Sequence, residues 1–191
     1  MRLFAFSGGY GSGKSTAIQS LYNWTRGRQT VLVKFAQPLY DIQEFIYSRI
    51  AGAHQRPADF VKDRKLLQWL GTEWGRSVDQ NLWVNIWKAK LEEIWALHPD
   101  AIIVCDDCRF DNEAEVVHAL GGVVIKLDRK NSEQHAQGGT GFGKAHASEA
   151  GLSPELIDFI VDNNSTLEDF QISLHALFGE LSVGASRSES A

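Results

Sequence analysis

The stretch RLFAFSGGYGSGKST, residues 2–16, sets out the first strand, turn and helix of the chain. RLFAF is an apolar run that predicts a β-strand, and GGYGSGKS at 8–15 matches the pattern G-x-x-x-x-G-K-[ST] in full. The glycines let successive backbone N–H groups converge on a phosphate at the start of a helix predicted over 14–25. The pattern assigns Lys14 to the β- and γ-phosphates of a nucleotide and the Ser15 hydroxyl to Mg²⁺. A Gly-rich turn with a solvated lysine is the weaker alternative, because a strand precedes the loop and a helix follows it.

Strands and helices alternate along the rest of the chain. With the Gly-rich loop, this alternation predicts an α/β protein, a three-layer α/β/α P-loop NTPase fold with a mostly parallel five-stranded sheet. The predicted strands are 2–6, 30–35, 101–105, 123–127 and 159–161. The predicted helices are 14–25, 38–51, one or two helices within 58–97, 111–120, and a last helix that starts where Ser165 and Glu168 have capping-box spacing.

The chain is expected to form one domain over residues 1–181, followed by a disordered tail at 182–191 that has no apolar periodicity. Its formal charge of −5 and pI near 5.7 argue against a general attraction to nucleic acid or to anionic membranes. A small anionic ligand held by local basic groups fits this charge better. The sequence has neither a signal peptide nor an apolar run of membrane-spanning length, which predicts a cytoplasmic protein.

The stretch VCDDCRFDNEAE, residues 104–115, holds both cysteines of the chain and two adjacent aspartates. If the strand that precedes it continues to Cys108, the α-carbons of Cys105 and Cys108 lie roughly 10 Å apart, too far for a disulfide. A zinc site would need further ligands that the sequence lacks, so both cysteines are interpreted as small buried hydrophobes. Asp106 and Asp107 stand where a P-loop protein usually carries an acid for Mg²⁺. Adjacent strand residues point to opposite faces, so only one of the two can aim at the phosphate loop.

Several blocks together resemble the deoxynucleoside monophosphate kinases of bacteriophages, which are P-loop enzymes of the nucleoside monophosphate kinase type. The blocks are GGYGSGKST at 8–16, FAQPL at 35–39, LLQWLGTEWGR at 66–76, LWV at 82–84, DCRFDNEAE at 107–115 and HASE at 146–149. The resemblance implies transfer of the ATP γ-phosphoryl group to the 5′-phosphate of a deoxynucleoside monophosphate, with Mg²⁺ required. The partners are then small nucleotides, and the oligomeric state stays open between monomer and homodimer.

The resemblance also implies roles for single residues. Those implied in catalysis are Lys14, Asp107, Arg109 and Arg76. Those implied in ATP binding are Gly9, Gly11, Ser12, Gly13, Lys14, Ser15, Thr16, Arg129 and Lys144. Those implied in binding the acceptor, within a helical region at about 36–97 and beyond it, are Phe35, Arg64, Gln68, Arg76, Trp83, Arg109, Asn112, Glu113 and His146. The metal ligands are Ser15 with Asp107 or Asp106; the family commonly has an apolar or small residue at the position of Asp106, and a proline at that of Asp111.

In the helical region, polar residues recur every four positions from Arg64, while Leu67, Leu70 and Trp74 form an apolar face. From composition alone, Arg64 and Arg76 would each form a surface ion pair. The resemblance favours a substrate role for Arg76 and leaves Arg64 balanced between the two.

A Gly-rich loop at 138–143 resembles a lid that covers about 130–147. When the lid closes, Arg129, Lys144 and His146 could contact the nucleotide phosphates. A plain surface loop is the alternative. Most tryptophans between 69 and 95 are predicted to be packing residues. The resemblance sets Trp83 apart from them, beside the acceptor.

Two further functions stay open. P-loop kinases that phosphorylate a modified base of the 5-hydroxymethyluracil type in phage DNA share this fold, but they need a basic track that the net acidity disfavours. A nucleotide-dependent switch or binding module is weaker still, because the nearest match to a guanine-reading N-K-x-D motif, DNNS at 162–165, lacks its lysine.

Overall fold

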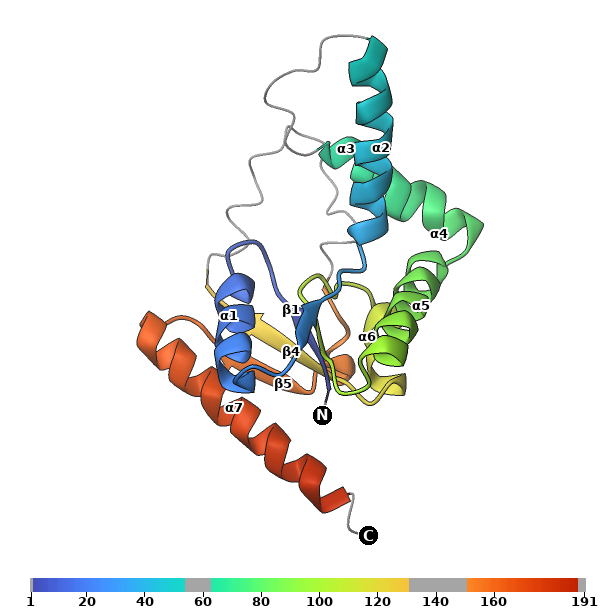
Figure 1. Cartoon of the computed structure of the whole chain (residues 1–191). Coiled ribbons are helices and arrows are strands. Elements are labelled where there is room, and N and C mark those ends of the chain that lie inside the picture. Colours follow the sequence, from blue (N-terminus) through green and yellow to red (C-terminus); the bar gives the residue numbers. More distant parts are fainter. Residues whose placement is uncertain (1, 54–62, 131–150, 189–191) are drawn as a thin grey trace.

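A computed structural model describes residues 2–53, 63–130 and 151–188 of the chain (Figure 1). Strands and helices alternate as the sequence predicts. The elements are β1 (Leu3–Ser7), α1 (Lys14–Thr25), β2 (Thr30–Leu32), α2 (Gln37–Ala53), α3 (Arg64–Gln68), the π-helix η1 (Trp69–Trp74), α4 (Gly75–Val78), α5 (Leu82–Leu97), β3 (Ile102–Cys105), α6 (Asp111–Ala119), β4 (Val123–Asp128), the 3₁₀ turn η4 (Pro154–Leu156), β5 (Phe159–Asp162) and α7 (Leu167–Ser188).

The strands form one five-stranded sheet in the order β2-β3-β1-β4-β5, and every neighbouring pair is parallel. β1 lies at the centre, with Ala5 paired to Cys105 on one side and to Val124 on the other. All residues of β1 and β3 are buried, as expected of strands covered on both faces. The predicted α/β fold with a parallel sheet is confirmed.

Helices cover both faces of the sheet (Figure 1). On one face α1 and α7 bury Leu21, Phe170 and Phe178 against Phe4 and Phe6 of β1. On the other face α5 and α6 bury another cluster, which includes Trp87, Leu91 and Val117. Because the carboxyl ends of parallel strands meet at one edge, the loops that follow β1, β2 and β3 come together there.

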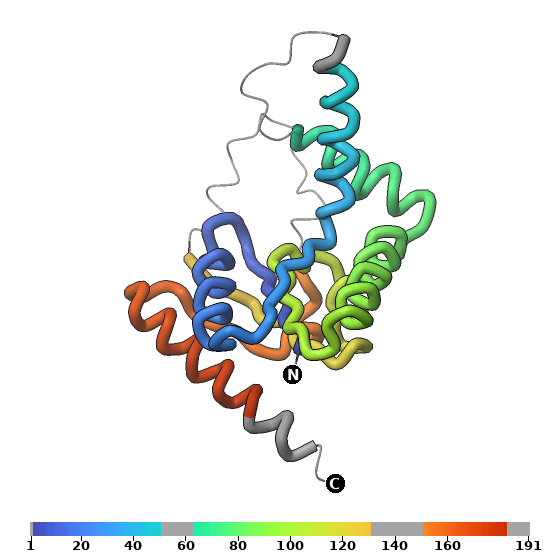
Figure 2. The backbone as a smooth tube through the Cα atoms, viewed as in Figure 1, coloured from blue at the N-terminus to red at the C-terminus, as the bar shows by residue number. Residues whose placement is uncertain are grey.

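The segment from α2 to α5 rises from this edge of the sheet (Figure 2). It has a small core of its own, made by Leu39, Leu67, Leu70 and Trp83. Between α3 and α4 the helix widens into the π-helix η1, in which the Gly75 N–H group bonds to the carbonyl of Leu70 five residues earlier. The buried positions therefore run Leu67, Leu70 and Gly75, whereas the predicted apolar face continues to Trp74, which is 41% exposed. The sequence pattern assumes an α-helical period throughout and misses the wide turn.

Both ends of α7 differ from prediction. Its capping box is formed one residue later than predicted, because Thr166 Oγ1 accepts from the Asp169 N–H group while the Asp169 carboxylate accepts from Thr166. The helix then continues to Ser188, through residues predicted to be a disordered tail. No proline interrupts this stretch, and each further residue adds a backbone hydrogen bond to an existing helix.

The two cysteines are free and fully buried, as predicted. The reasoning from strand geometry is wrong in one respect, because β3 ends at Cys105 and does not reach Cys108. Across the described ranges, every helix is too short or too polar to cross a membrane.

Candidate active site

The loop at 8–15 joins β1 to α1, and its conformation requires glycine at two points. Gly8 has φ +142°, and a Cβ there would lie 2.7 Å from the carbonyl oxygen of Leu127. Gly13 has φ +105°, and a Cβ there would lie 2.5 Å from Asn163 Nδ2. The same Asn163 amide donates to the Ser12 carbonyl at 2.9 Å. Asn163, which follows β5, therefore fixes the backbone of the loop through this hydrogen bond.

Lys14, the first residue of α1, turns its ammonium back over the loop. It donates to the carbonyls of Gly8 and Gly9, each at 2.7 Å. Burial lowers the pKa of Lys14, and the positive charge of Arg109 lowers it further. The two positive charges repel each other, and an anion beside them would reduce this repulsion.

Arg129 reaches the same loop from the end of β4. Its Nη1 donates to the carbonyl of Gly11 at 3.0 Å, so the structure places Arg129, which the resemblance assigns to ATP binding, against the loop at 8–15. Ser15 is exposed and Thr16 is half-buried in the first turn of α1.

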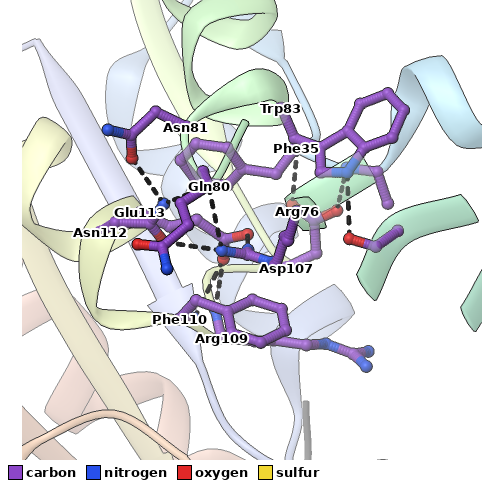
Figure 3. Close-up of polar contacts among 12 residues, drawn as sticks. Phe35, Arg76, Gln80, Asn81, Trp83, Asp107, Arg109, Phe110, Asn112 and Glu113 are labelled. Atoms are coloured by element: carbon purple, nitrogen blue, oxygen red, sulfur yellow. Dashed lines mark hydrogen bonds and ion pairs between the residues drawn. The ribbon is translucent and has the colours of Figure 1, made fainter. Parts of the chain in front are cut away.

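Asp107 connects the end of β3 to the start of α2 (Figure 3). Its Oδ1 accepts from the Phe35 N–H group at 3.0 Å, and its Oδ2 accepts from that of Ala36 at 2.9 Å. The Cys105 thiol also donates to Oδ1, at 3.2 Å. Burial raises the pKa of Asp107, and these hydrogen bonds oppose the rise. Both oxygens of the acid that the resemblance favours for Mg²⁺ thus already accept hydrogen bonds from the protein.

Asp106 has a different environment. Its Oδ2 lies 3.2 Å from the Lys34 ammonium, and 15% of the aspartate side chain is exposed. Its Oδ1 is buried and has no hydrogen-bond partner among the described residues. Of the two aspartates, Asp106 is therefore the one with a carboxylate oxygen that lacks a protein partner among the described residues.

Arg76 is held by α6 and the residue before it (Figure 3). Its Nη1 donates to Asn112 Oδ1 at 3.1 Å, and its Nη2 lies 3.1 Å from Glu113 Oε1. The guanidinium carbon sits 3.6 Å above the centre of the Phe110 ring, a cation–π contact. Burial lowers the pKa of Arg76, whereas the charge of Glu113 raises it. Both terminal nitrogens of the guanidinium are thereby bound within the protein, and its Nε is buried without a hydrogen-bond partner among the described residues.

Glu113 links this arginine to the backbone of the loop after β3. Its Oε2 accepts from the N–H groups of Arg109 at 2.8 Å and Phe110 at 3.1 Å, as an acid in the first turn of a helix does. Burial raises the pKa of Glu113 to about 7, although both hydrogen bonds and the charge of Arg76 oppose the rise. Through Glu113, α4 is tied directly to the residue that carries the Arg109 side chain.

The Arg109 guanidinium extends away from this cluster (Figure 3). Its side chain is exposed and makes no hydrogen bond or ion pair with the part of the chain that the structure describes. A pocket of about 430 Å³ lies here, lined by Arg76, Arg109, Phe110, Asn112 and Gly151 among others. The structure thus brings together three of the predicted acceptor residues.

Two aromatic residues predicted to contact the acceptor are core residues. Phe35 is 3% exposed and stacks on Trp87 with ring centroids 4.2 Å apart. Trp83 is 4% exposed and donates from Nε1 to the Gly71 carbonyl at 3.0 Å. Neither ring has a free face for a ligand, because both fill the space between helices. Trp69, predicted to be a packing residue, is instead 52% exposed.

The remaining predicted residues lie apart from this cluster. Arg64 and Gln68 are exposed on α3. Lys144, His146 and the predicted lid fall outside the described residues.

Two residues near the site, Lys34 and Asn163, have no prediction from the sequence. Lys34 lies two residues beyond β2, and a lysine that ends a short apolar run is the signal that could have identified it. Asn163 follows β5 in a stretch considered only as a guanine-reading motif.

The strand order, the Gly-rich loop between β1 and α1 and the helical excursion after β2 define a P-loop kinase fold. The chain belongs to the deoxynucleotide monophosphate kinase family, whose model matches residues 15–174. A putative deoxynucleotide monophosphate kinase of Acanthamoeba polyphaga mimivirus is 30% identical, over 89% of this chain and 92% of that protein. The resemblance drawn from the motifs is confirmed, and the chain is a nucleotide kinase by family.

One solved structure supports the fold, and a second shows a weaker likeness. The crystal structure of TT1252 from Thermus thermophilus matches 94% of this chain and 97% of its own with a TM-score of 0.50 at 19% identity. A dephospho-CoA kinase from Campylobacter jejuni covers 94% of this chain and 96% of its own at 17% identity, with a TM-score of 0.46. The likeness to TT1252 bears on the fold alone.

Membership of a kinase family leaves the non-catalytic binding module without support.

Proposed function

We propose that the protein transfers the γ-phosphoryl group of ATP to the 5′-phosphate of a deoxynucleoside monophosphate, giving the diphosphate. The observation that carries the proposal is the placement of the Arg109 guanidinium. It is exposed beside a pocket, and its charge acts on Lys14 at the Gly-rich loop. Phosphoryl transfer needs two phosphates held in line and their charge neutralised, with little covalent help from the protein. A cation on each side of the transferred group meets that need.

The donor is assigned to the loop at 8–15. Its N–H groups and the start of α1 favour an anion, and Lys14 and Arg129 add two cations above it. The acceptor is assigned to the pocket beside Arg109 and Asn112. Arg76 acts here as a positioning residue, because its bonds to Glu113 fix the loop that carries Arg109.

Mg²⁺ belongs to the proposal, and the donor set fits it. Across the ranges 2–53, 63–130 and 151–188, no three acidic, His or Cys side chains are grouped to hold a metal by themselves. A sparse set suits Mg²⁺, which keeps several waters and binds through one or two protein oxygens and the phosphates. We assign Ser15 and Asp106 to it, because Asp106 Oδ1 is buried without a partner and Asp107 is occupied. Bound there, the ion would neutralise charge on the β- and γ-phosphates.

The test is ATP turnover with Mg²⁺ across a panel of deoxynucleoside and ribonucleoside monophosphates. At least one deoxynucleoside monophosphate should stimulate ADP formation in the wild type. Lys14→Ala should abolish this stimulation, and Lys88→Ala, which changes an exposed lysine on α5, should preserve it. If no monophosphate stimulates turnover, the proposal fails. Tight binding of duplex DNA at low salt, measured by mobility shift, would then favour the base kinase instead.

A further inference from the structure

Lys34 lies at the carboxyl end of β2, next to the site. The ladder continues one residue past the strand, because the Val33 N–H group bonds to the Val104 carbonyl at 2.8 Å. β3 is the neighbour of β2 and separates it from β1. Adjacent strands are about 4.8 Å apart, so a lysine side chain that follows β2 is long enough to reach the end of β3. The Lys34 ammonium accordingly reaches Asp106, at the end of β3, at 3.2 Å.

The backbone around Lys34 is fixed from both sides. The indole of Trp87 donates to the carbonyl of Val33 at 3.0 Å in the core. Asp107 receives the next two N–H groups of the chain. An ordinary surface ion pair is worth little and needs no such anchoring. Here the polar contacts fix the backbone on both sides of Lys34, so the partly exposed Lys34 ammonium has a defined position.

The charges around Lys34 leave room for an anion. The charge of Lys14 interacts with those of Lys34 and Arg109, and both lysines interact with two carboxylates, Asp106 and Asp107. The Asp107 carboxylate is already stabilised by backbone N–H groups. An ammonium has three donors, and Asp106 Oδ2 is the one polar partner that Lys34 has within the described ranges. Two donors of Lys34 therefore remain for a ligand.

The strand order indicates which phosphate, that of the donor or that of the acceptor, the Lys34 ammonium would bind. The loop at 8–15, Arg129 and Asn163 follow β1, β4 and β5, on one side of β3. Lys34 follows β2 on the other side, where α2 and the helical segment begin (Figure 1). The donor occupies the first side in the proposed reaction, which leaves the acceptor on the second.

We propose that Lys34 is a further substrate-binding residue, whose ammonium bridges Asp106 and the 5′-phosphate of the acceptor. This inference rests on the proposed function and specifies it. The ion pair with Asp106 orients the ammonium, while its remaining N–H groups bind the phosphate oxygens. Lys34 thereby complements Arg109, which approaches from the loop after β3.

The test is calorimetric titration of the full chain with the most stimulating deoxynucleoside monophosphate, without ATP or Mg²⁺. Lys34→Met keeps the apolar stem and should raise the Kd by more than about tenfold, and Lys34→Arg should recover part of the affinity. The matched deoxynucleoside, which lacks the phosphate, should bind wild type and Lys34→Met alike. The affinity for ATP should change less than about twofold. Lys88→Ala serves as the control.

An unchanged Kd for the monophosphate in Lys34→Met would overturn the inference, and so would an equal loss of affinity for the deoxynucleoside. If Lys34→Met does not fold, by circular dichroism, the Lys34→Arg and Lys34→Gln variants decide on the same criteria. The two proposals fail separately. Wild-type turnover with an unaltered Lys34→Met affinity refutes only the role of Lys34, whereas no turnover with any monophosphate refutes the reaction.

Discussion

Replacing Glu113 by Gln should change how the stability of the protein depends on pH. Burial raises the pKa of Glu113 from an ordinary value of 4.5 to about 7. Between these two values the folded chain keeps a proton on this carboxyl that the unfolded chain has released. Stability therefore falls as pH rises through this interval and levels off above the folded pKa.

The magnitude follows from the two pKa values. Each pKa unit corresponds to about 1.4 kcal/mol, and between pH 5 and pH 8 the carboxyl accounts for a loss of about 2.5 kcal/mol. Gln has no proton to release, so Glu113→Gln lacks this component. The free energy of unfolding of the wild type, relative to the variant, should fall by that amount over the interval.

Urea unfolding at pH 5, 6, 7 and 8 measures this difference directly. Glu115→Gln is the matched control, because Glu115 is exposed on the same helix. Contributions from other acids cancel when variant and wild type are compared at each pH. A relative stability that stays level or rises between pH 5 and pH 8 would refute the reasoning. It would mean that the ion pair with Arg76 offsets burial and keeps Glu113 ionised throughout this interval.

Four more substitutions test other parts of the structure. Gly75→Ala should lower the free energy of unfolding by about 1–3 kcal/mol, because the new Cβ would lie 2.5 Å from the Trp83 indole nitrogen. Gly179→Ala should raise the free energy of unfolding by about 0.5–1 kcal/mol, because its new Cβ would meet nothing within 4 Å. Equal effects of the two substitutions in urea unfolding would contradict this expectation. Asp107→Ala should cost about 2–4 kcal/mol of unfolding free energy, because two backbone N–H groups lose their acceptor; a midpoint within error of wild type would remove its anchoring role. Arg109→Ala should lower turnover by more than about a hundredfold with little change in the unfolding midpoint, and a loss of only a few-fold would sink its assignment.

The elements with strong local signals could be predicted from the sequence. α1 begins at Lys14 and ends at Thr25 as predicted, because the glycines on either side fix its ends. β3 is found within a residue, because a short apolar run between polar breakers has no other good conformation. The resemblance of several motifs to one family added the reaction class, and the family match confirms it.

The roles of single side chains depend on contacts that are distant in the sequence. Asp107 binds backbone groups some 70 positions earlier, and no local pattern reveals that its oxygens are taken. Trp83 stands beside a family motif, yet the helix packing around Gly71 and Gly75 buries it. Arg76 lines the same pocket as Arg109, but its bonds to Glu113 become visible only when α4 and α6 are brought together.

The wide turn at η1 has a consequence for the length of the chain. A π-turn absorbs one residue more than an α-turn, so deleting one residue between Trp69 and Trp74 would restore a regular α-helix. Arg76 would then still face Glu113. A one-residue deletion in α5 would instead rotate everything beyond it by about 100°. A relative that is one residue shorter at η1 can therefore keep what α4 presents to the site.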